Sequence, residues 1–472
     1  MDESGVTVSD PSIEIVRPIP LITPAVERLI LVIAIVLFAA ALHLAHYLYL
    51  QPSWEYLGMT YAAPDTIRYV FGLILVVAAG LLVPTKFSAP SSVFVLALVF
   101  VVFIPTVVIT LGLRADAMER YGWQVLALAA AFFLACIVCR NDSAVSAPGA
   151  LPGPVFVWSL LVLWAIGSIV TVLVYGGRLK LVGFGDVYEQ RGVGQASSAA
   201  VAYLQTYYLN VICPAVLAVG LLDRKRPWMI LVALFGFGLA YSIAAQKSAL
   251  FVPFVMLGIY VAMSPVGRFL GLTATIATFL GTAIGFGIWA VFAVGDNWYS
   301  AIVVHRTIAI PGLTFSQYSN FFSEVGYTFW GHVRGLSAFV PVPEALKASP
   351  LWPNIGYLVG EYAYGDPTHN LNANLFSSDG IAAAGPLGVL VIGAVFALWL
   401  KILDWAGRGW SRQFAALVLL PVAVSLTNGP LFTVLLSFGG LFWTVVFAAY
   451  KPKWQLTPRA DEAPQASPAK AG

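Results

Sequence analysis

The chain alternates long apolar runs with short polar breaks along most of its length. Windows of about 19 residues place apolar runs near residues 29–50, 67–84, 91–113, 121–139, 154–175, 197–222, 227–245, 247–264, 269–293, 381–402, 413–428 and 431–450. About 20 apolar residues in a helix suffice to cross a hydrocarbon layer of roughly 30 Å. Two neighbouring pairs, within 227–264 and 413–450, can each also be read as one broken helix. The pattern therefore predicts an all-α polytopic integral membrane protein with about 12 transmembrane helices, or 11 if a pair is one span.

One long interval, residues 294–380, interrupts this pattern late in the chain. It is rich in Gly, Pro and aromatic residues, and disordered linkers are poor in aromatics. We therefore expect it to form short helices and turns on the outer face of the membrane. The tails at residues 1–28 and 451–472 are rich in Pro and are predicted to be disordered and cytoplasmic. The transmembrane domain thus spans residues 29–450 and includes the outer loop.

Composition agrees with a membrane protein. The 472 residues are 60% hydrophobic and 10% charged, whereas a soluble globular chain carries about 25% charged residues. A net charge of +3 without an extended basic patch excludes a soluble nucleic-acid binder. The three cysteines all fall in apolar runs and are expected to pack as small hydrophobic side chains, at residues Cys136, Cys139 and Cys213.

Lys and Arg are more frequent in the even-numbered loops and the C-terminal tail than in the odd-numbered loops. Because cytoplasmic loops carry the excess of these residues, both termini are predicted to be cytoplasmic. The long loop then lies on the outer face of the plasma membrane. A group of six cations is predicted on that same face, where this rule disfavours them: Arg178, Lys180, Arg191, Lys247, Arg306 and Arg334.

Cations at the edge of the hydrocarbon layer cost several kcal/mol unless they are paired or solvated, which favours a functional role with an anionic partner. Arg suits phosphate because its planar fork donates two hydrogen bonds to adjacent oxygens. The structural alternative is that these side chains reach the interface and pair with nearby carboxylates, namely Asp186, Glu189, Asp296 or Glu324.

The long loop contains three histidines, His305, His332 and His369, whose spacing matches no zinc motif, so no metal site is expected. Imidazole titrates near neutral pH and is suited to take a proton from a sugar hydroxyl. The carboxylates of the loop compete for this general-base role: Asp296, Glu324, Glu361, Asp366 and Asp379. No phosphate-binding glycine motif is present, so a nucleotide cofactor is not expected.

The segment 369–388 leads from the loop into the next apolar run and carries Asn372, Asn374 and Asp379. These side chains supply the donors and acceptors that bind sugar hydroxyls. The alternative is a helix start capped by Asn, with Gly380, Gly385 and Gly388 allowing close helix packing.

Four blocks together resemble bacterial O-antigen polymerases, the Wzy-type oligosaccharide repeat-unit polymerases. They are Val187-Tyr188-Glu189-Gln190-Arg191-Gly192, Gln246-Lys247-Ser248, the stretch from Arg306 through Pro311-Gly312 to Tyr318, and Asn372-Ala373-Asn374 through Asp379-Gly380 to Gly385. The layout of about a dozen spans with one late outer loop resembles that family over nearly the whole chain.

The resemblance implies a C-type glycosyltransferase fold and a polymerase acting on undecaprenyl diphosphate-linked oligosaccharides at the outer face of the plasma membrane. It would move a growing glycan from its lipid diphosphate carrier onto an incoming repeat unit, with no cofactor. Within that picture we assign Arg191, Lys247 and Arg306 to the diphosphate and His369 to proton transfer. Arg178 and Arg334 would bind substrate, as would Tyr318 by stacking on sugar rings and Asn372, Asn374 and Asp379 by hydrogen bonding. The implied partners are the lipid bilayer, a flippase and a chain-length regulator.

Two other functions fit parts of the pattern. An O-antigen ligase also has about twelve spans and a long outer loop, but delivers finished glycan to a different acceptor. A polysaccharide or lipid-linked glycan transporter would have as many spans, but is expected to show internal repeats and polar residues near mid-membrane. The two halves of this chain show no convincing repeat.

Overall fold

The computed structural model describes residues 23–141, 150–180, 198–244, 247–263, 271–333 and 335–450, and in these residues the chain forms helices and no strand. The first half contains α1 (Pro24–Ala45), η1 (His46–Leu50), α2 (Gln51–Trp54), η2 (Glu55–Leu57), α3 (Thr66–Leu82), α4 (Ser92–Leu98), η3 (Val99–Phe103), α5 (Ile104–Gly112), α6 (Ala117–Asn141), α7 (Pro154–Tyr175), η4 (Gly176–Arg178), α9 (Ala199–Tyr207), η5 (Tyr208–Ile212), α10 (Cys213–Leu222) and α11 (Trp228–Ala244).

The second half contains α12 (Lys247–Ala262), α13 (Leu272–Val294), α14 (Trp298–Ser300), η7 (Ala301–Ala309), α15 (Ile310–Val325), α16 (Glu344–Lys347), α17 (Ile355–Tyr364), η8 (Phe376–Ile381), α18 (Ala382–Ala406), α19 (Arg412–Leu426), α20 (Leu431–Ser437) and α21 (Gly440–Ala449). The interval between α13 and η8 is therefore folded into helices and turns.

In the described chain, seven helical segments are long and apolar enough to cross a membrane: Pro24–Leu57, Ser92–Gly112, Ala117–Cys139, Pro154–Arg178, Ala199–Leu222, Leu272–Val294 and Phe376–Ala406. The pair α20 and α21 passes the same test together and is bent by 54°. Four shorter apolar helices lie beside them, Thr66–Leu82, Trp228–Ile243, Ser248–Ala262 and Arg412–Leu426. The prediction of an all-α polytopic membrane protein is confirmed.

The first span starts earlier than the apolar run suggested. The hydroxyl of Thr23 accepts from the Val26 N–H, and Pro24 occupies the first turn, where its missing N–H costs nothing. The helix therefore begins at Pro24 rather than near residue 29. It continues through the wide turn of η1 to Leu57 and stops at Gly58, whose φ of 90° suits glycine.

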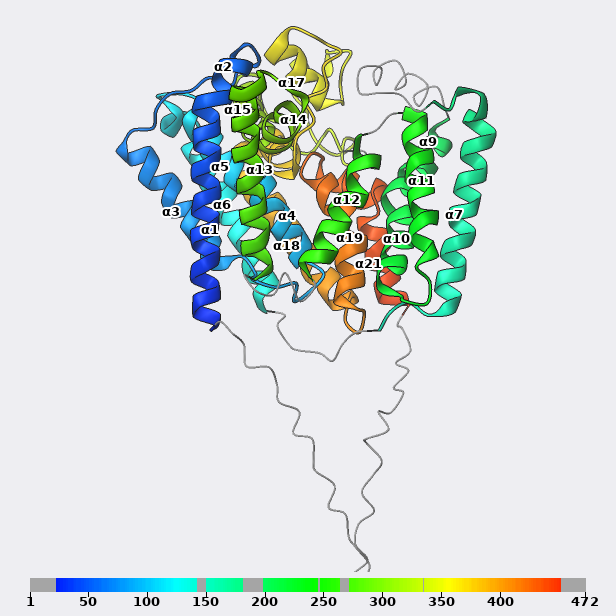
Figure 1. Cartoon of the computed structure of the whole chain (residues 1–472). Helices are drawn as coiled ribbons and strands as arrows, with labels where there is room; N and C mark the ends of the chain where they lie inside the picture. The colour runs from blue at the N-terminus through cyan, green and yellow to red at the C-terminus, as the bar shows by residue number, and fades with distance from the viewer. Residues whose placement is uncertain are drawn as a thin grey trace, which may run out of the picture.

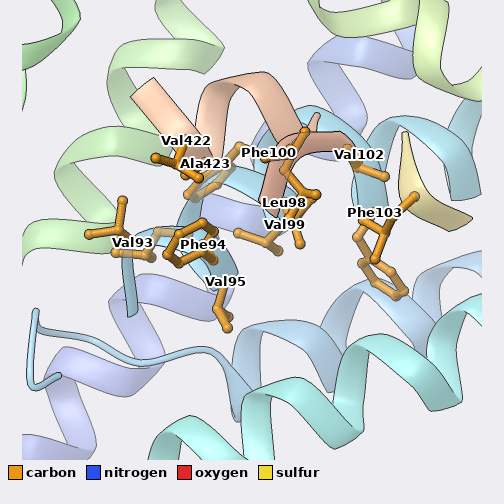
Figure 2. Packing of buried hydrophobic residues seen from close by; sticks show 14 of the residues in the cluster. Val93, Phe94, Val95, Leu98, Val99, Phe100, Val102, Phe103, Val422 and Ala423 are labelled. Atoms are coloured by element: carbon orange, nitrogen blue, oxygen red, sulfur yellow. The ribbon is translucent and has the colours of Figure 1, made fainter. Parts of the chain in front are cut away.

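The most enclosed span is α4–η3–α5, of which 83% is buried, compared with 28% for α7 and 22% for α13. Its side chains pack with those of α19, as Figure 2 shows for Phe94, Val99, Val422 and Ala423. Spans such as α7 and α13 instead leave most of their apolar side chains facing outward, where a lipid environment solvates them. The burial pattern thus distinguishes core spans from peripheral ones.

The helices give the molecule two distinct ends (Figure 1). At the lower end α1 begins and α21 ends, and Lys86 pairs with Glu27 at 3.4 Å. At the upper end α2, α15 and α17 lie above the long helices. The polar part of the late interval is therefore gathered on one side of the apolar bundle.

Close packing at glycine shapes the entry into the long helix α18. The backbone breaks at Ala384 and at Gly385, whose φ is 58°. A Cβ at Gly388 would lie 2.1 Å from the carbonyl oxygen of Gly380, and one at Gly380 would lie 3.0 Å from Val389. The short helix η8 therefore packs directly onto α18, and this placement fixes Asp379 inside the protein.

Candidate functional site

The structure places only part of the predicted cation group. Arg178 is exposed at the end of η4, which follows α7, and Arg306 is exposed in η7. Arg191 and Arg334 lie outside the described residues. Lys247 is the first residue of helix α12. Lys180 is exposed just after η4, and the gathering of all six cations around one anion remains a prediction.

A buried cation at the same end of the molecule is already satisfied. Arg68 is 4% exposed and binds Asp65 at 3.0 Å. Its guanidinium also donates to the carbonyl oxygens of Ala63, Leu111 and Arg114. Arg68 therefore joins α3 to the end of α5, and we assign it no role in binding an anionic substrate.

Arg306 and His369 both lie near Tyr364. Burial raises the pKa of Tyr364, and the hydrogen bond from Gln317 and the charge of Arg306 oppose that rise. The rings of Tyr364 and His369 meet edge to face with centroids 4.8 Å apart. The Tyr364 hydroxyl accepts from Gln317 at 3.0 Å. Arg306 and His369, two of the predicted site residues, thus both lie beside Tyr364, which the sequence did not single out.

Arg306 is preceded by a buried histidine. His305 is 4% exposed, and its ring stacks on Trp54 with centroids 4.0 Å apart and an interplanar angle of 7°. Burial, with the neighbouring charge of Arg306 as a smaller cause, lowers the pKa of His305 to about 4. His305 is therefore neutral near pH 7, and its stacking ties η7 to α2.

The predicted sugar-binding residues differ in exposure. Asn372 is exposed, whereas Asn374 is 1% exposed. The side-chain oxygen of Asn374 accepts from the N–H groups of Phe376 and Ser377 at 3.0 and 3.3 Å. Asn374 thus caps the start of η8, as the structural alternative anticipated.

Tyr318 is also enclosed, with 1% of its surface exposed, and its hydroxyl donates to the carbonyl oxygen of Leu371 at 2.9 Å. Burial raises the pKa of this phenol. No ring face of Tyr318 is open to a ligand in this structure, which corrects the expectation that it stacks on a sugar. Its hydrogen bond instead holds the 369–375 segment against α15.

The arrangement most suited to chemistry is a buried pair formed by His332 and Asp379. Their side chains are 7% and 1% exposed, and Nε2 of His332 lies 3.6 Å from Oδ1 of Asp379. Oδ2 of Asp379 accepts from the N–H of Leu431, the first residue of α20. Neither Nε2 nor Oδ1 has a hydrogen-bond partner.

The hydrogen bonds around His332 indicate which nitrogen carries its proton. The Thr328 hydroxyl donates to the carbonyl oxygen of Ala382 at 3.0 Å, so it accepts from Nδ1 of His332 at 2.8 Å. A neutral His332 then turns the lone pair of Nε2 toward the carboxylate. At 3.6 Å, Nε2 of His332 and Oδ1 of Asp379 are too far apart for a direct hydrogen bond.

Other buried polar atoms in the two segments that carry this pair also lack partners. They are Trp330 Nε1, Asn374 Nδ2 and Ser377 Oγ. Native proteins leave few such groups unpaired, because each costs about 1–3 kcal/mol. Phe329 and Trp330 have φ values of 46° and 65°, and non-glycine residues rarely adopt such backbone angles outside functional sites and tight turns. The turn carrying His332 is therefore both strained and polar inside.

Sequence reasoning included Asp379 but left His332 among several candidate bases. Asp379 comes from the segment preceding α18 and His332 from the turn after α15, so no local spacing links them. Among the described residues, no group of three or more His, Cys, Asp or Glu could hold a metal ion. Comparisons with family models, curated proteins and solved structures find no match to this chain.

Proposed function

We propose that the protein is a membrane polysaccharide polymerase that joins undecaprenyl diphosphate-linked oligosaccharide repeat units at the outer face of the bacterial plasma membrane. The four sequence blocks described above support this proposal. The seven long apolar segments, the bent pair and the four shorter apolar helices support a polytopic membrane protein, and twelve spans are part of the proposal. Both termini would be cytoplasmic, with α2, α15 and α17 outside.

The single observation that carries an enzymatic role is the His332–Asp379 couple, whose facing atoms Nε2 and Oδ1 have no hydrogen-bond partner. In glycosyl transfer, a sugar hydroxyl oxygen bonds to the anomeric carbon as the bond from that carbon to the diphosphate oxygen breaks. The hydroxyl must lose its proton, and a base at a buried site takes it efficiently. We assign that proton to the couple, with Asp379 orienting and stabilising the imidazolium that forms.

The leaving lipid diphosphate gains negative charge in the transition state, and fixed cations can stabilise that charge without a metal. We assign this role to Arg306, with Arg178, Arg191, Lys247 and Arg334 as further contributors. Exposed Asn372 and half-buried His369 would contact the incoming sugar beside Tyr364. Because the couple is enclosed, a shift of the turn at residues 327–333 would admit the hydroxyl.

The test is incubation of the purified full chain with a synthetic undecaprenyl diphosphate-linked repeat unit. A ladder of products, each longer by one repeat, is expected. Arg306→Lys should reduce the rate about tenfold or more, because a point charge replaces the bidentate fork. Arg412→Lys, an exposed arginine at the start of α19, is the matched control and should leave the ladder unchanged.

Absence of a ladder with the wild-type chain would refute the proposal. Transfer of preformed polymer to a second acceptor, without elongation, would point to ligase activity instead. A normal ladder from Arg306→Lys would remove Arg306 from the mechanism while leaving the polymerase assignment intact.

A further inference from the structure

A cleft of about 320 Å³ lies between the α2–η2 region and the start of α14. Its walls come from two segments far apart in the sequence and include Tyr49, Ser53, Trp54, Tyr56, Asp296 and Trp298. Tyr56 is 74% exposed and Trp298 is 62% exposed. The cleft therefore combines open aromatic surface with a carboxylate and a hydroxyl.

The polar groups of the cleft are held in place. The Ser53 hydroxyl donates to Oδ1 of Asp296 at 3.0 Å, which links the two walls. Nε1 of Trp54 donates to the Tyr49 hydroxyl at 3.1 Å. Asn297 binds the N–H and hydroxyl of Ser300 at 3.0 and 3.2 Å and fixes the start of α14. The site is preorganised, which lowers the entropy cost of binding a ligand.

We propose that this cleft is a carbohydrate subsite, which binds sugar residues of the glycan away from the bond that reacts. The apolar faces of pyranose rings pack on aromatic rings, and the carboxylate accepts hydrogen bonds from hydroxyl groups. The negative charge of Asp296 disfavours a phosphate, so the proposed ligand is the hydroxyl-rich glycan and not the lipid diphosphate.

The position of the cleft links it to the candidate site. Trp54 stacks on His305, the neighbour of Arg306. The Tyr364 hydroxyl also donates to the carbonyl oxygen of Leu57, at the end of η2. The α2–η2 wall of the cleft therefore contacts the group of Arg306, Tyr364 and His369 through one ring stacking and one hydrogen bond. This inference rests on the proposed function for its substrate.

Direct binding tests this subsite without requiring catalysis. The full chain in phosphatidylcholine nanodiscs is titrated calorimetrically with soluble oligosaccharides of one, two and three repeat units cut from the host's own surface polysaccharide. Wild-type protein should bind, and the Tyr56→Ala/Trp298→Ala double variant should lose about tenfold or more in affinity. Asp296→Asn, which keeps an acceptor for Ser53, should lose less.

The matched control is Tyr203→Ala/Trp123→Ala, two aromatics that are 52% and 73% exposed outside the cleft; it should bind as wild type does. No binding by the wild-type chain, or equal binding by the cleft variant, overturns the subsite. If the cleft variant binds the oligosaccharides as the wild type does and only lowers the thermal stability of the protein in nanodiscs, these residues belong to the aromatic belt of the membrane interface, and the subsite is likewise overturned. Glycan binding without a polymer ladder would refute the polymerase and retain the subsite. A ladder and a binding affinity that are both unchanged in the cleft variant would retain the polymerase and refute the subsite.

Discussion

Two buried carboxylates lie near opposite ends of one long helical segment, Phe376–Ala406, and they are satisfied differently. Asp404 is 3% exposed, and its two oxygens accept from the N–H and the hydroxyl of Ser91 at 2.7 and 2.5 Å. Asp379 is fully buried, and one oxygen accepts from Leu431 while the other faces His332 without a hydrogen bond.

The difference supports the proposal that Asp404 is a structural carboxylate and that Asp379 takes part in proton transfer. Asp404 holds the start of α4 against the end of α18, and its bonds are complete. Asp379 performs a similar capping task at α20 with one oxygen but keeps the second oxygen available. Burial is common to both carboxylates, so the proposal for Asp379 depends on its unsatisfied oxygen and not on burial.

The largest expected effect follows from removing the charge of Asp379. Asp379→Asn keeps an oxygen to accept from Leu431 but removes the negative charge that would stabilise the imidazolium of His332. Polymerisation should fall by about 10³-fold, or about 4 kcal/mol in transition-state stabilisation, while the protein stays folded. The measurement is the initial rate of ladder formation per mole of monodisperse protein.

His332→Gln provides the internal check on that result. If the two residues act as one unit, the double variant should be no slower than Asp379→Asn alone. Additive losses would show that the residues act separately, and unchanged activity in Asp379→Asn would place this carboxylate in the same structural class as Asp404.

The corresponding change at the other end should affect stability. Asp404→Asn turns an amide group toward the donors of Ser91 and should cost about 3 kcal/mol in unfolding free energy. Activity per folded molecule should remain near that of the wild type. Thermal unfolding of the purified protein, combined with the ladder assay, measures both quantities; loss of activity without loss of stability would reverse the comparison.

A smaller effect is expected at His305, which is a buried titratable group outside the couple. Its pKa is lowered to about 4 in the folded protein, so the unfolded chain, with a pKa near 6.5, binds more protons between these values. Stability contributed by neutral His305 is complete above about pH 6.5 and is lost as the pH falls toward 4. About 2 kcal/mol should disappear between pH 7 and 5.

The His305→Gln variant should lack this part of the pH dependence. Unfolding midpoints of wild type and variant, compared at pH 7 and pH 5, measure the difference. Equal slopes would show that His305 is accessible to protons in the folded state and that its stacking on Trp54 does not protect it.

The smallest effect is expected from Ser91→Ala. This change removes the hydroxyl that donates to Asp404 but keeps the backbone N–H, so one oxygen retains its partner. The cost should be about 1–2 kcal/mol, less than that of Asp404→Asn. Ser377→Ala is the matched control near Asp379: its hydroxyl is buried without a hydrogen bond, so its removal should be close to neutral in stability.

The membrane-spanning pattern could be predicted from the sequence because the length of each apolar run is set directly by the thickness of the bilayer. Helix ends were harder to predict, because the start at Pro24 depends on the Thr23 cap, which lies outside the apolar run. The sequence offered two interpretations of residues 372–379, a capped helix start and a polar site. In the structure Asn374 caps the helix and Asp379 is a buried acid.

The His332–Asp379 couple could not be predicted, because it depends on how the turn after α15 packs onto η8. Tyr318 was misjudged for a related reason. Aromatic residues in an outer loop suggest exposed stacking surfaces, but here α15 packs inward and buries that ring. The aromatics that stay open, Tyr56 and Trp298, meet only because distant segments converge.

The contact between Gly388 and the backbone of Gly380 limits how this region can change by mutation. Even a methyl group at residue 388 would collide with the neighbouring carbonyl, so substitutions along this seam would shift the buried acid itself. Exposed positions such as Tyr56, Trp298 and Asn372 carry no such restriction. Attempts to alter which glycan is accepted, by selection or by design, should therefore find tolerated variants at the rim and almost none along the glycine seam.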